Sequence, residues 1–275
     1  MSAAVPTLAP YVRPAGVVPT RASWATVAKR WRGFAITGSY MHEVYEAQLE
    51  ICTPANARTF AQVRAHPHGR KIIRDKPDLL ALLRDDEYLA SLPPGSVGHG
   101  YRSFLTTNRF DAGVFDEAAV IRPIAEARNW HEDFYYFMVR YTAIHDLLHV
   151  VCGYGADMAG EVSVIGFQSG QMEPSGPYGK FGHLMAAWIP GATPAHKLRV
   201  YRQAIERGRR ADKLAAAPWE QLLPQPLDEV RAELGVTPWR TAHPDGTWFS
   251  TWTPPGMAPP TRWNYDEILA AELRG

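Results

Sequence analysis

A long apolar run that ends in a cluster of ionisable side chains constrains this chain more than any other feature. Residues 134–144 contain one charged side chain, that of Arg140, and the next five residues read His-Asp-Leu-Leu-His (145–149). Such a run is apolar enough to be buried, and unpaired ionisable groups at the end of a buried segment are costly. Because a bound metal ion would remove that cost, the pattern predicts a buried helix that carries metal ligands.

The spacing of these side chains fits a single divalent ion. In an α-helix, His145 and His149 lie about 40° apart and Asp146 lies about 60° beyond His149, so one face offers three ligands. Glu161 follows His149 after eleven residues. It can supply a fourth ligand if the chain reverses at the glycines between them, Gly153, Gly155 and Gly160. The mixed nitrogen and oxygen shell favours zinc and also suits iron, manganese or magnesium.

Composition limits the class of protein. The chain has 275 residues, 46% of them apolar and 21% charged, which is enough for a sizeable core in one large or two small domains. A net charge of +1 argues against a nucleic-acid partner. The two cysteines, Cys52 and Cys152, are too few for a disulfide framework and indicate a reducing compartment. Cys152 lies near the motif, where we interpret it as a small core residue.

Residues 1–22 are interpreted as a flexible leader. No acidic residue precedes Glu43, a bias that transit peptides share. Four prolines within the first 19 residues interrupt any amphipathic helix there, and the apolar core of a secretory signal is missing. No run approaches the roughly 18 apolar residues of a membrane-spanning helix. We therefore expect an untargeted leader on a chain that does not cross a bilayer.

The segment after this leader predicts an amphipathic helix. Ser23 is a plausible N-cap, and two sets of side chains then occupy opposite faces. The apolar face has Trp24, Val27, Ala28, Trp31 and Phe34, and the basic face has Lys29, Arg30 and Arg32. Basic residues opposite tryptophans are typical of a helix in a membrane interface, but also of a helix whose tryptophans face the core. The candidate membrane contacts are Trp24, Trp31, Lys29 and Arg30.

The remaining chain predicts helices divided by turns, and alternating β-branched runs typical of strands hardly occur. Helices are expected over 41–51, 59–73 after a break at Pro54, 79–89, 97–105, 129–151 and 194 to about 217. Prolines after Trp239 predict an extended tail over 241–275 that ends in a short helix from Tyr265. The expected fold is therefore all-α, with a single helical domain over 23–240 and a metal site at the end of its long central helix.

The motif at 145–161 resembles the signature of the coenzyme Q biosynthesis proteins of the Coq-four family, His-Asp-x-x-His followed after eleven residues by Glu. Similar family segments extend over about residues 60–240. They are 68–73 (His-Gly-Arg-Lys-Ile-Ile), the turn 92–98 with Tyr101 and 104–105, Arg140-Tyr141, and 219–220 through 226–235. The leader and the tail beyond Trp239 have no counterpart in this resemblance.

The resemblance implies an all-helical fold, a metal on His145, Asp146, His149 and Glu161, and an apolar cavity for a polyprenyl tail. It also implies peripheral association with a membrane surface, often as a homodimer, and other quinone biosynthesis enzymes as partners. The expected location is cytoplasmic on the inner face of the cell membrane in a bacterium, or the mitochondrial inner membrane in a eukaryote. Family members are regarded either as organisers of ubiquinone assembly or as the catalyst that removes the C1 carboxylate of a polyprenylated 4-hydroxybenzoate and hydroxylates that carbon.

In the catalytic interpretation, the metal acts as a Lewis acid, with Glu161 and Asp146 as the catalytic carboxylates. Oxygen chemistry would need iron, manganese or a substrate-derived carbanion, because zinc has no redox change available. Arg140, His99 and Tyr101 are candidates for binding the substrate.

Two other classes stay open. A non-catalytic organiser that holds prenyl lipid would fit a metal shell closed by four protein ligands. A metal-dependent hydrolase of the zincin type would need Glu after the first histidine, where this chain has Asp146. A di-iron bundle is disfavoured, because Asp146-x-x-His149 has no partner Glu-x-x-His.

Overall fold

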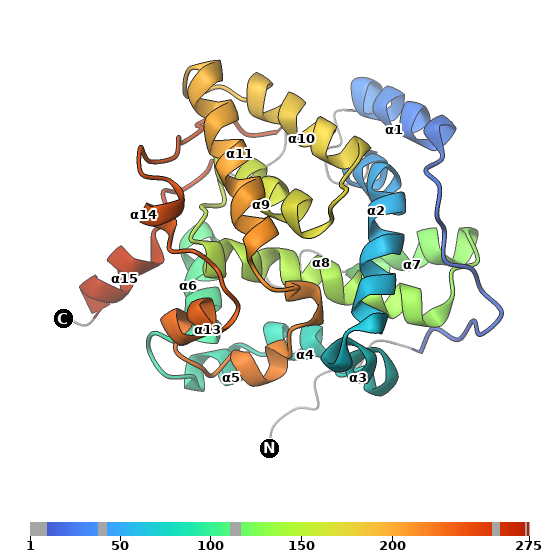
Figure 1. Cartoon of the computed structure of the whole chain (residues 1–275), viewed down its shortest axis with the longest axis horizontal. Helices are drawn as coiled ribbons and strands as arrows, with labels where there is room; N and C mark the ends of the chain where they lie inside the picture. The colour runs from blue at the N-terminus through green and yellow to red at the C-terminus, as the bar shows by residue number, and fades with distance from the viewer. Residues whose placement is uncertain (1–9, 38–42, 111–116, 255–258, 273, 275) are drawn as a thin grey trace.

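The fold is built around the helix that carries the His-Asp-Leu-Leu-His sequence. This helix, α8, spans Glu132–Cys152 and crosses the middle of the molecule in Figure 1. Most of its residues are buried. His131 caps its start by accepting a hydrogen bond from Asp133 N, and acidic residues in the first turn favour the positive end of the helix dipole. Gly153 ends it in the left-handed conformation at φ 73°. These end signals fix where the motif lies, in the last two turns of a core helix.

A computed structural model describes residues 10–37, 43–110, 117–254, 259–272 and 274. Over these residues the chain is helical and has no β-strand, which confirms the predicted fold class. Backbone pairing of the β type within them is limited to the bridges Val17–Trp130 and Ser96–Pro226. No described helix is long and apolar enough to cross a membrane.

The helices other than α8 surround it. They are α1 Trp24–Thr37, α2 Tyr45–Ala65, α3 Pro67–Asp75, α4 Leu79–Arg84, α5 Asp86–Ser91, α6 Val97–Asn108, α7 Glu117–Ala127, α9 Met158–Gln171, α10 Pro177–Trp188, α11 Pro194–Arg210, the 3₁₀ turn η2 Leu214–Ala216, α12 Trp219–Leu222, α13 Leu227–Glu233, α14 Trp239–Ala242 and α15 Tyr265–Glu272. α9 packs along α11 and α10 on one side of α8, whereas α1 and α2 lie on the other side of α10 (Figure 1).

Four predicted boundaries were wrong. The predicted helix 59–73 is divided at His66, which is extended, and the predicted helix 79–89 is divided at Asp85, whose side chain caps the start of α5. α2 continues through Pro54 instead of breaking there. Ile51 and Ala55, on either side of the proline, are buried, so tertiary packing outweighs the roughly 3 kcal/mol that a proline costs inside a helix. α11 ends at Arg210 rather than near residue 217, because Ala211 is extended and the chain then forms η2.

The segments at both ends of the chain lie against the helical body. From Pro10 on, the predicted leader runs over α7 and α8, where the Tyr11 hydroxyl donates to the carbonyls of Ala125 and Trp130 at 3.1 and 2.9 Å. The tail contains the expected terminal helix, α15, and it reaches α6, where Trp263 packs on Phe104. Residues 1–9 lie outside the described part of the chain.

Candidate metal centre

The turn between α8 and α9 brings the candidate ligands together. Gly153 starts the reversal with its positive φ. The chain then packs so tightly that a Cβ on Gly160 would lie 1.8 Å from the carbonyl oxygen of Gly155. Asp157 caps the start of α9 by accepting a hydrogen bond from Ala159 N at 3.0 Å. Glu161 follows in the first turn of α9 and faces back toward α8.

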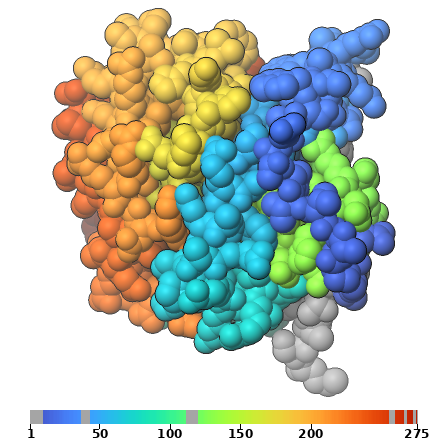
Figure 2. All heavy atoms as spheres, turned by 45° about the vertical axis from the view of Figure 1, so that its right-hand side comes forward, coloured from blue at the N-terminus to red at the C-terminus, as the bar shows by residue number. Residues whose placement is uncertain are grey.

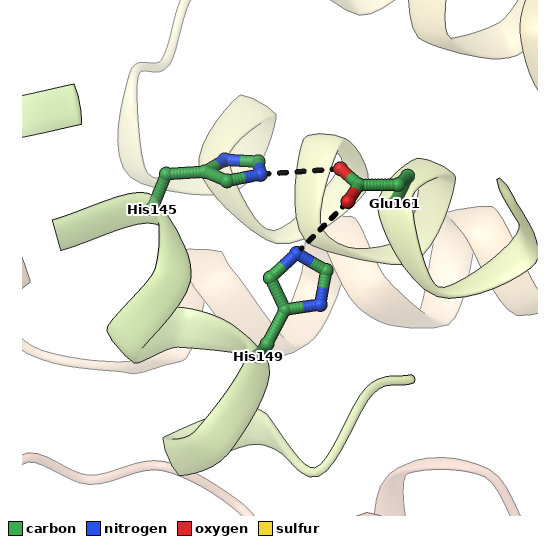
Figure 3. A group of neighbouring side chains, drawn as sticks. All are labelled: His145, His149 and Glu161. Carbon is green, nitrogen blue, oxygen red and sulfur yellow. Dashed lines mark hydrogen bonds and ion pairs between the residues drawn. The ribbon is translucent and has the colours of Figure 1, made fainter. Parts of the chain in front are cut away.

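Three of the four predicted ligands form one group. A ligand atom of each of His145, His149 and Glu161 lies within 4.8 Å of the others. Glu161 Oε2 is 3.2 Å from His145 Nε2, and Glu161 Oε1 is 3.4 Å from His149 Nε2 (Figure 3). Each carboxylate oxygen thus faces one imidazole, and all three side chains point toward the same place. Two imidazole nitrogens and a carboxylate are a donor set that zinc and other divalent transition metals accept.

The far nitrogen of each imidazole has a partner that leaves Nε2 free for a ligand bond. His149 Nδ1 donates to the backbone carbonyl of Gly155 at 3.0 Å, and a carbonyl can only accept. His145 Nδ1 faces Gln168 Oε1 at 3.2 Å, and the Tyr178 hydroxyl donates to that same oxygen. In the neutral rings these contacts keep the proton on Nδ1 and the lone pair on Nε2. Metal-binding histidines are usually oriented in this way, so the residues present fit a divalent metal.

Electrostatics favour a positive charge at this point. Burial alone would raise the pKa of Glu161, but the nearby His149 and His145 outweigh burial and hold that pKa well below its usual range. Burial alone would lower the pKa of His145, but its hydrogen bond to Glu161 and the charges of Glu161 and Asp146 raise it to about 9. Glu161 is therefore a carboxylate, and a divalent cation would displace a proton from His145.

Asp146 does not belong to the group within 4.8 Å. It follows His145 directly, so its side chain leaves α8 about 100° away from that of His145, and a short aspartate does not bridge the difference. It lies close enough for its charge to raise the pKa of His145. Burial raises the pKa of Asp146 itself. A direct ligand bond from Asp146 stays a prediction.

The group is buried on one side and accessible on the other. His149 is 1% exposed, whereas the side chains of His145 and Glu161 are 24% and 32% exposed. The ring of Phe104 stacks on His149 with 5.0 Å between centroids. A ligand could therefore approach from the side of His145 and Glu161.

The three candidate substrate-binding residues do not join this group. Arg140 is 3% exposed and forms a two-pronged ion pair with Glu220 of α12, in which Nη2 and Oε2 are 3.0 Å apart. Arg140 also donates to the carbonyl of Ala217. His99 Nδ1 hydrogen-bonds to the Tyr265 hydroxyl at 2.8 Å, and Tyr101 is buried in the core. A role for any of them in binding substrate stays a prediction.

Sequence reasoning missed the side chains around the ligands. Gln168 lies seven residues after Glu161, about two helical turns, so both face α8; this spacing could have identified it. Phe104 and Tyr178 come from α6 and α10, and no local pattern connects them to the motif. Their positions depend on how distant helices pack.

An all-helical fold with two histidines and a glutamate that meet between two consecutive helices, accessible on the side of His145 and Glu161, defines a candidate metalloprotein class. Comparison with known families is more specific: residues 50–240 match the family model described as "Coenzyme Q (ubiquinone) biosynthesis protein Coq4". The chain belongs to this family. That assignment confirms the resemblance found in the sequence, and it extends over the helices that build the site.

Individual relatives agree with this assignment. The chain is similar to the mitochondrial ubiquinone biosynthesis protein COQ4 homologs of Rattus norvegicus, at 31% identity, and Mus musculus, at 30%; each match extends over 75% of both chains. The fold is similar to the crystal structure of a protein from Nostoc punctiforme assigned to ubiquinone biosynthesis. That match has a TM-score of 0.53 and 19% identity, and it covers 78% of this chain and 96% of the other.

Proposed function

We propose that this chain acts in ubiquinone biosynthesis as a metal-dependent enzyme that removes the C1 carboxylate of a polyprenylated 4-hydroxybenzoate. The number of protein ligands is the observation that supports catalysis most directly. His145, His149 and Glu161 make three, and three protein ligands with an open position are typical of catalytic metal sites, whereas structural sites are closed by four. The exposed sides of His145 and Glu161 give a substrate carboxylate access to that open position.

In this proposal each residue of the site has its own role, which depends on its position. A divalent metal held by the three side chains would supply Lewis-acid stabilisation of the charge that develops as carbon dioxide leaves. Gln168 and the Gly155 carbonyl hold the two imidazoles with Nε2 facing inward. Glu161 contributes the negative charge that balances a cation, and Asp146 adds a second negative charge beside His145. Asp146 and Glu161 remain the candidate catalytic carboxylates.

The bond changes in the proposed reaction balance as follows. The bond between C1 and the carboxylate breaks, carbon dioxide leaves, and the electron pair stays on the ring, where a proton is taken up at C1. Putting a hydroxyl at C1 instead of hydrogen is a two-electron oxidation. With dioxygen as the oxidant it also requires a two-electron donor, and one oxygen atom leaves as water.

We also propose where the polyprenyl chain begins. A pocket lies at the start of α9, one turn before Glu161, between Phe110 and Met158 of the body and three prolines of the tail, Pro254, Pro259 and Pro260. Six of its nine lining residues are apolar, but its volume of about 30 Å³ holds only a water-sized group. The tail, whose prolines form one wall, would therefore have to move for an isoprenoid chain to enter. Other quinone biosynthesis enzymes and a second copy of this chain are further candidate partners.

The surface of α1 and α10 supports a contact with the membrane from which such a substrate must be taken. Trp24 and Trp31 are 58% and 37% exposed on α1, and Leu184 and Trp188 are 67% and 60% exposed on α10. The two helices lie side by side at one end of the molecule (Figures 1 and 2), where the rings of Trp31 and Phe181 are 6.3 Å apart.

The charges on these two helices fit anionic headgroups. Neither α1 nor α10 contains an acidic residue, and Lys29, Arg32 and Lys180 are exposed there. Arg30, predicted as a membrane contact, instead pairs with Glu43 and Glu46 and is therefore less available to lipid. None of Lys29, Arg32 and Lys180 forms an ion pair with an acidic residue in the described part of the chain, and exposed tryptophans beside such basic residues are typical of an interfacial helix. We name Trp24, Trp31, Ile36, Leu184 and Trp188 the apolar end surface.

Direct assay of the purified protein tests the catalytic proposal. The protein would be loaded in turn with zinc, iron, manganese or magnesium and given the prenylated acid, with and without dioxygen and a two-electron donor. We expect release of carbon dioxide, and loss of it in Glu161→Gln, which keeps the shape of the side chain but removes its charge. Glu229→Gln, an exposed glutamate on α13, is the control and should retain the rate.

A second measurement separates the enzyme from the organiser. A strain that lacks the protein should accumulate a prenylated benzoate that still has its C1 carboxylate. The organiser would be preferred if the protein bound the acid unchanged under every metal and if Glu161→Gln restored quinone synthesis in that strain.

A further inference from the structure

The C-terminal segment reaches both helices that carry the candidate metal ligands. This segment comprises residues 243–254 and 259–272 and follows residue 240, where the family match ends. In Figure 1 it runs along the side of the molecule that contains α6 and the end of α8. Its contacts there lead to His149 and to the first turn of α9 by two separate routes.

The first route is a series of aromatic rings that ends on His149. The ring of Trp263 packs edge-on against Phe104 with 5.2 Å between centroids, and Phe104 stacks on His149 at 5.0 Å and 23°. Trp263 is 6% exposed and Tyr265 stacks behind it at 6.1 Å. The Tyr265 hydroxyl is fixed in turn by His99 Nδ1 at 2.8 Å. The indole therefore holds Phe104 flat on the face of the imidazole.

The second route is a hydrogen bond to the cap of α9. Ser250 N donates to Asp157 Oδ2 at 2.9 Å, and the same oxygen accepts from Ala159 N at 3.0 Å. Ser250 and Asp157 are both buried. Asp157 thus joins the tail to the first turn of α9, one turn before Glu161. A shift of the tail would change the start of the helix that positions this carboxylate.

We propose that the C-terminal segment positions the metal ligands of this chain, with Trp263 as the positioning residue for His149. This inference rests on the proposed metal centre. A stacked Phe104 restricts rotation of the imidazole about its Cβ–Cγ bond, and the Gly155 carbonyl fixes the ring in its plane. His149 Nε2 therefore faces Glu161 before any metal binds. Without the indole, Phe104 could move away from His149. The imidazole would then have to become ordered when the metal binds.

The chain offers a matched control for this idea. Trp248 also belongs to the C-terminal segment and is 7% exposed, close to the 6% of Trp263. In both, the buried indole N–H has no hydrogen-bond partner among the described residues. Trp248 is not part of the ring series at His149. Trp263→Leu and Trp248→Leu thus remove similar buried rings. Only the first removes the ring packed on Phe104, whereas the second can act on the site only indirectly, through Ser250 and the cap of α9.

The experiment measures binding of Co²⁺, a spectroscopic probe for histidine and carboxylate ligands, by competition with a chelator and by the visible absorption of the bound ion. We expect Trp263→Leu to weaken Co²⁺ binding by about tenfold or more, the usual range for residues that orient ligands, and to change the absorption band at saturation. Trp263→Phe, which restores a ring, should recover most of the affinity and the wild-type band. Trp248→Leu should lose clearly less affinity than Trp263→Leu and keep the wild-type band.

Four outcomes would overturn the inference. Trp263→Leu could bind Co²⁺ with the wild-type affinity and band, Trp248→Leu could lose as much affinity, or Trp263→Phe could fail to rescue. If Trp263→Leu does not fold, Trp263→Met is judged by the same criteria, because its unbranched side chain can extend further into the space left by the indole. Wild-type protein that binds no Co²⁺ would reject the metal centre as well, which separates that failure from failure of the tail alone.

Discussion

Ionisable side chains are usually exposed and large apolar ones buried, and two regions of the molecule break this rule in opposite ways. They are the end of α8 and the outer faces of α1 and α10. At the first, His149 is 1% exposed inside the core, with the carboxylate of Glu161 beside it. At the second, Trp24 and Trp188 are about 60% exposed to solvent. Burying ionisable groups costs free energy unless a partner group or an ion satisfies them, and exposing large aromatic rings costs free energy unless another surface covers them. Local departures of this kind are expected where a protein functions.

The comparison shows what type of partner each region requires. The buried ionisable groups converge on a single point, which suits an ion. The exposed apolar groups are distributed over two helices with basic residues around them, which suits an extended surface such as a bilayer. If both interpretations are correct, variants at the first region should change metal binding and stability, whereas variants at the second should change membrane binding and leave the fold intact.

The largest expected effect is at the metal centre. His149→Ala removes one of three ligands and should abolish most metal binding. With metal at about 1,000 times its Kd, wild-type protein should gain about 4 kcal/mol of stability from binding, and the variant should lose that gain. Metal analysis and unfolding with and without metal measure both quantities. His183→Ala, a histidine of α10 outside the group, is the control; equal stoichiometric metal in His149→Ala would reject the site.

Arg140 sharpens the comparison, because it is a buried charge with a protein partner. Arg140→Ala leaves Glu220 without its partner and should lower the free energy of unfolding by about 3 kcal/mol, with little change in metal affinity. Arg210→Ala removes an exposed pair with Glu206 and should cost less than about 1 kcal/mol. Denaturant unfolding measures both. A stable Arg140→Ala that no longer binds the prenylated acid would instead support the predicted substrate role.

His243 provides the corresponding comparison between histidines. It is buried like His149, but its nitrogens face Tyr154 and Gln203 at 2.8 and 3.0 Å. Burial, with the positive charge of Arg207, lowers the pKa of His243 to about 3. In the unfolded chain that pKa is about 6.5, so the unfolded state binds more protons between these values and the folded state loses stability as pH falls below 6.5.

Between pH 7 and 5 this group alone should therefore cost about 2 kcal/mol. The measurement is the free energy of unfolding of wild type and His243→Gln at the two pH values, since the other titrating groups cancel in the difference. His243→Gln should be less sensitive to acid than the wild type. Equal losses in both proteins would mean that His243 does not titrate in this range.

The sequence predicted different parts of the molecule for different physical reasons. The spacing of His145, His149 and Glu161 was sufficient to predict that these side chains meet. The two histidines share a helix face, and the glycines between α8 and α9 allow one close reversal. Asp146 shows the limit of that reasoning, since a helical wheel does not say how far a short side chain reaches. Trp263 and Phe104 could not be identified, because they are far apart in the sequence and meet only through the packing of the tail on α6.

The sequence also did not predict which face of α1 packs against the helical body. The pattern placed Val27 and both tryptophans on one face, which left core and membrane as alternatives. In the structure Val27 is 7% exposed and turns toward the body, whereas Trp24 is 58% exposed. Tryptophans that face the core and tryptophans that face outward differ by less than one quarter turn about the axis of α1. Only the packing of α1 against α2 distinguishes these two orientations. The outward position of the tryptophans makes the membrane interpretation directly testable.

The smallest expected effect on stability is on the apolar end surface. Trp24→Ser with Leu184→Ser should change the free energy of unfolding by no more than about 0.5 kcal/mol per site, because each side chain is mostly exposed. Binding to vesicles that contain anionic lipid should nevertheless fall clearly, because interfacial helices bind through their buried apolar area. Added salt should weaken wild-type binding further, since Lys29, Arg32 and Lys180 would each contribute about 1 kcal/mol near a charged surface. Val12→Ser, an exposed apolar residue outside both helices, is the control. Co-sedimentation that is unchanged in the double variant would remove the lipid interpretation, and a wild-type dimer that dissociates in this variant would assign the surface to a second copy of the chain.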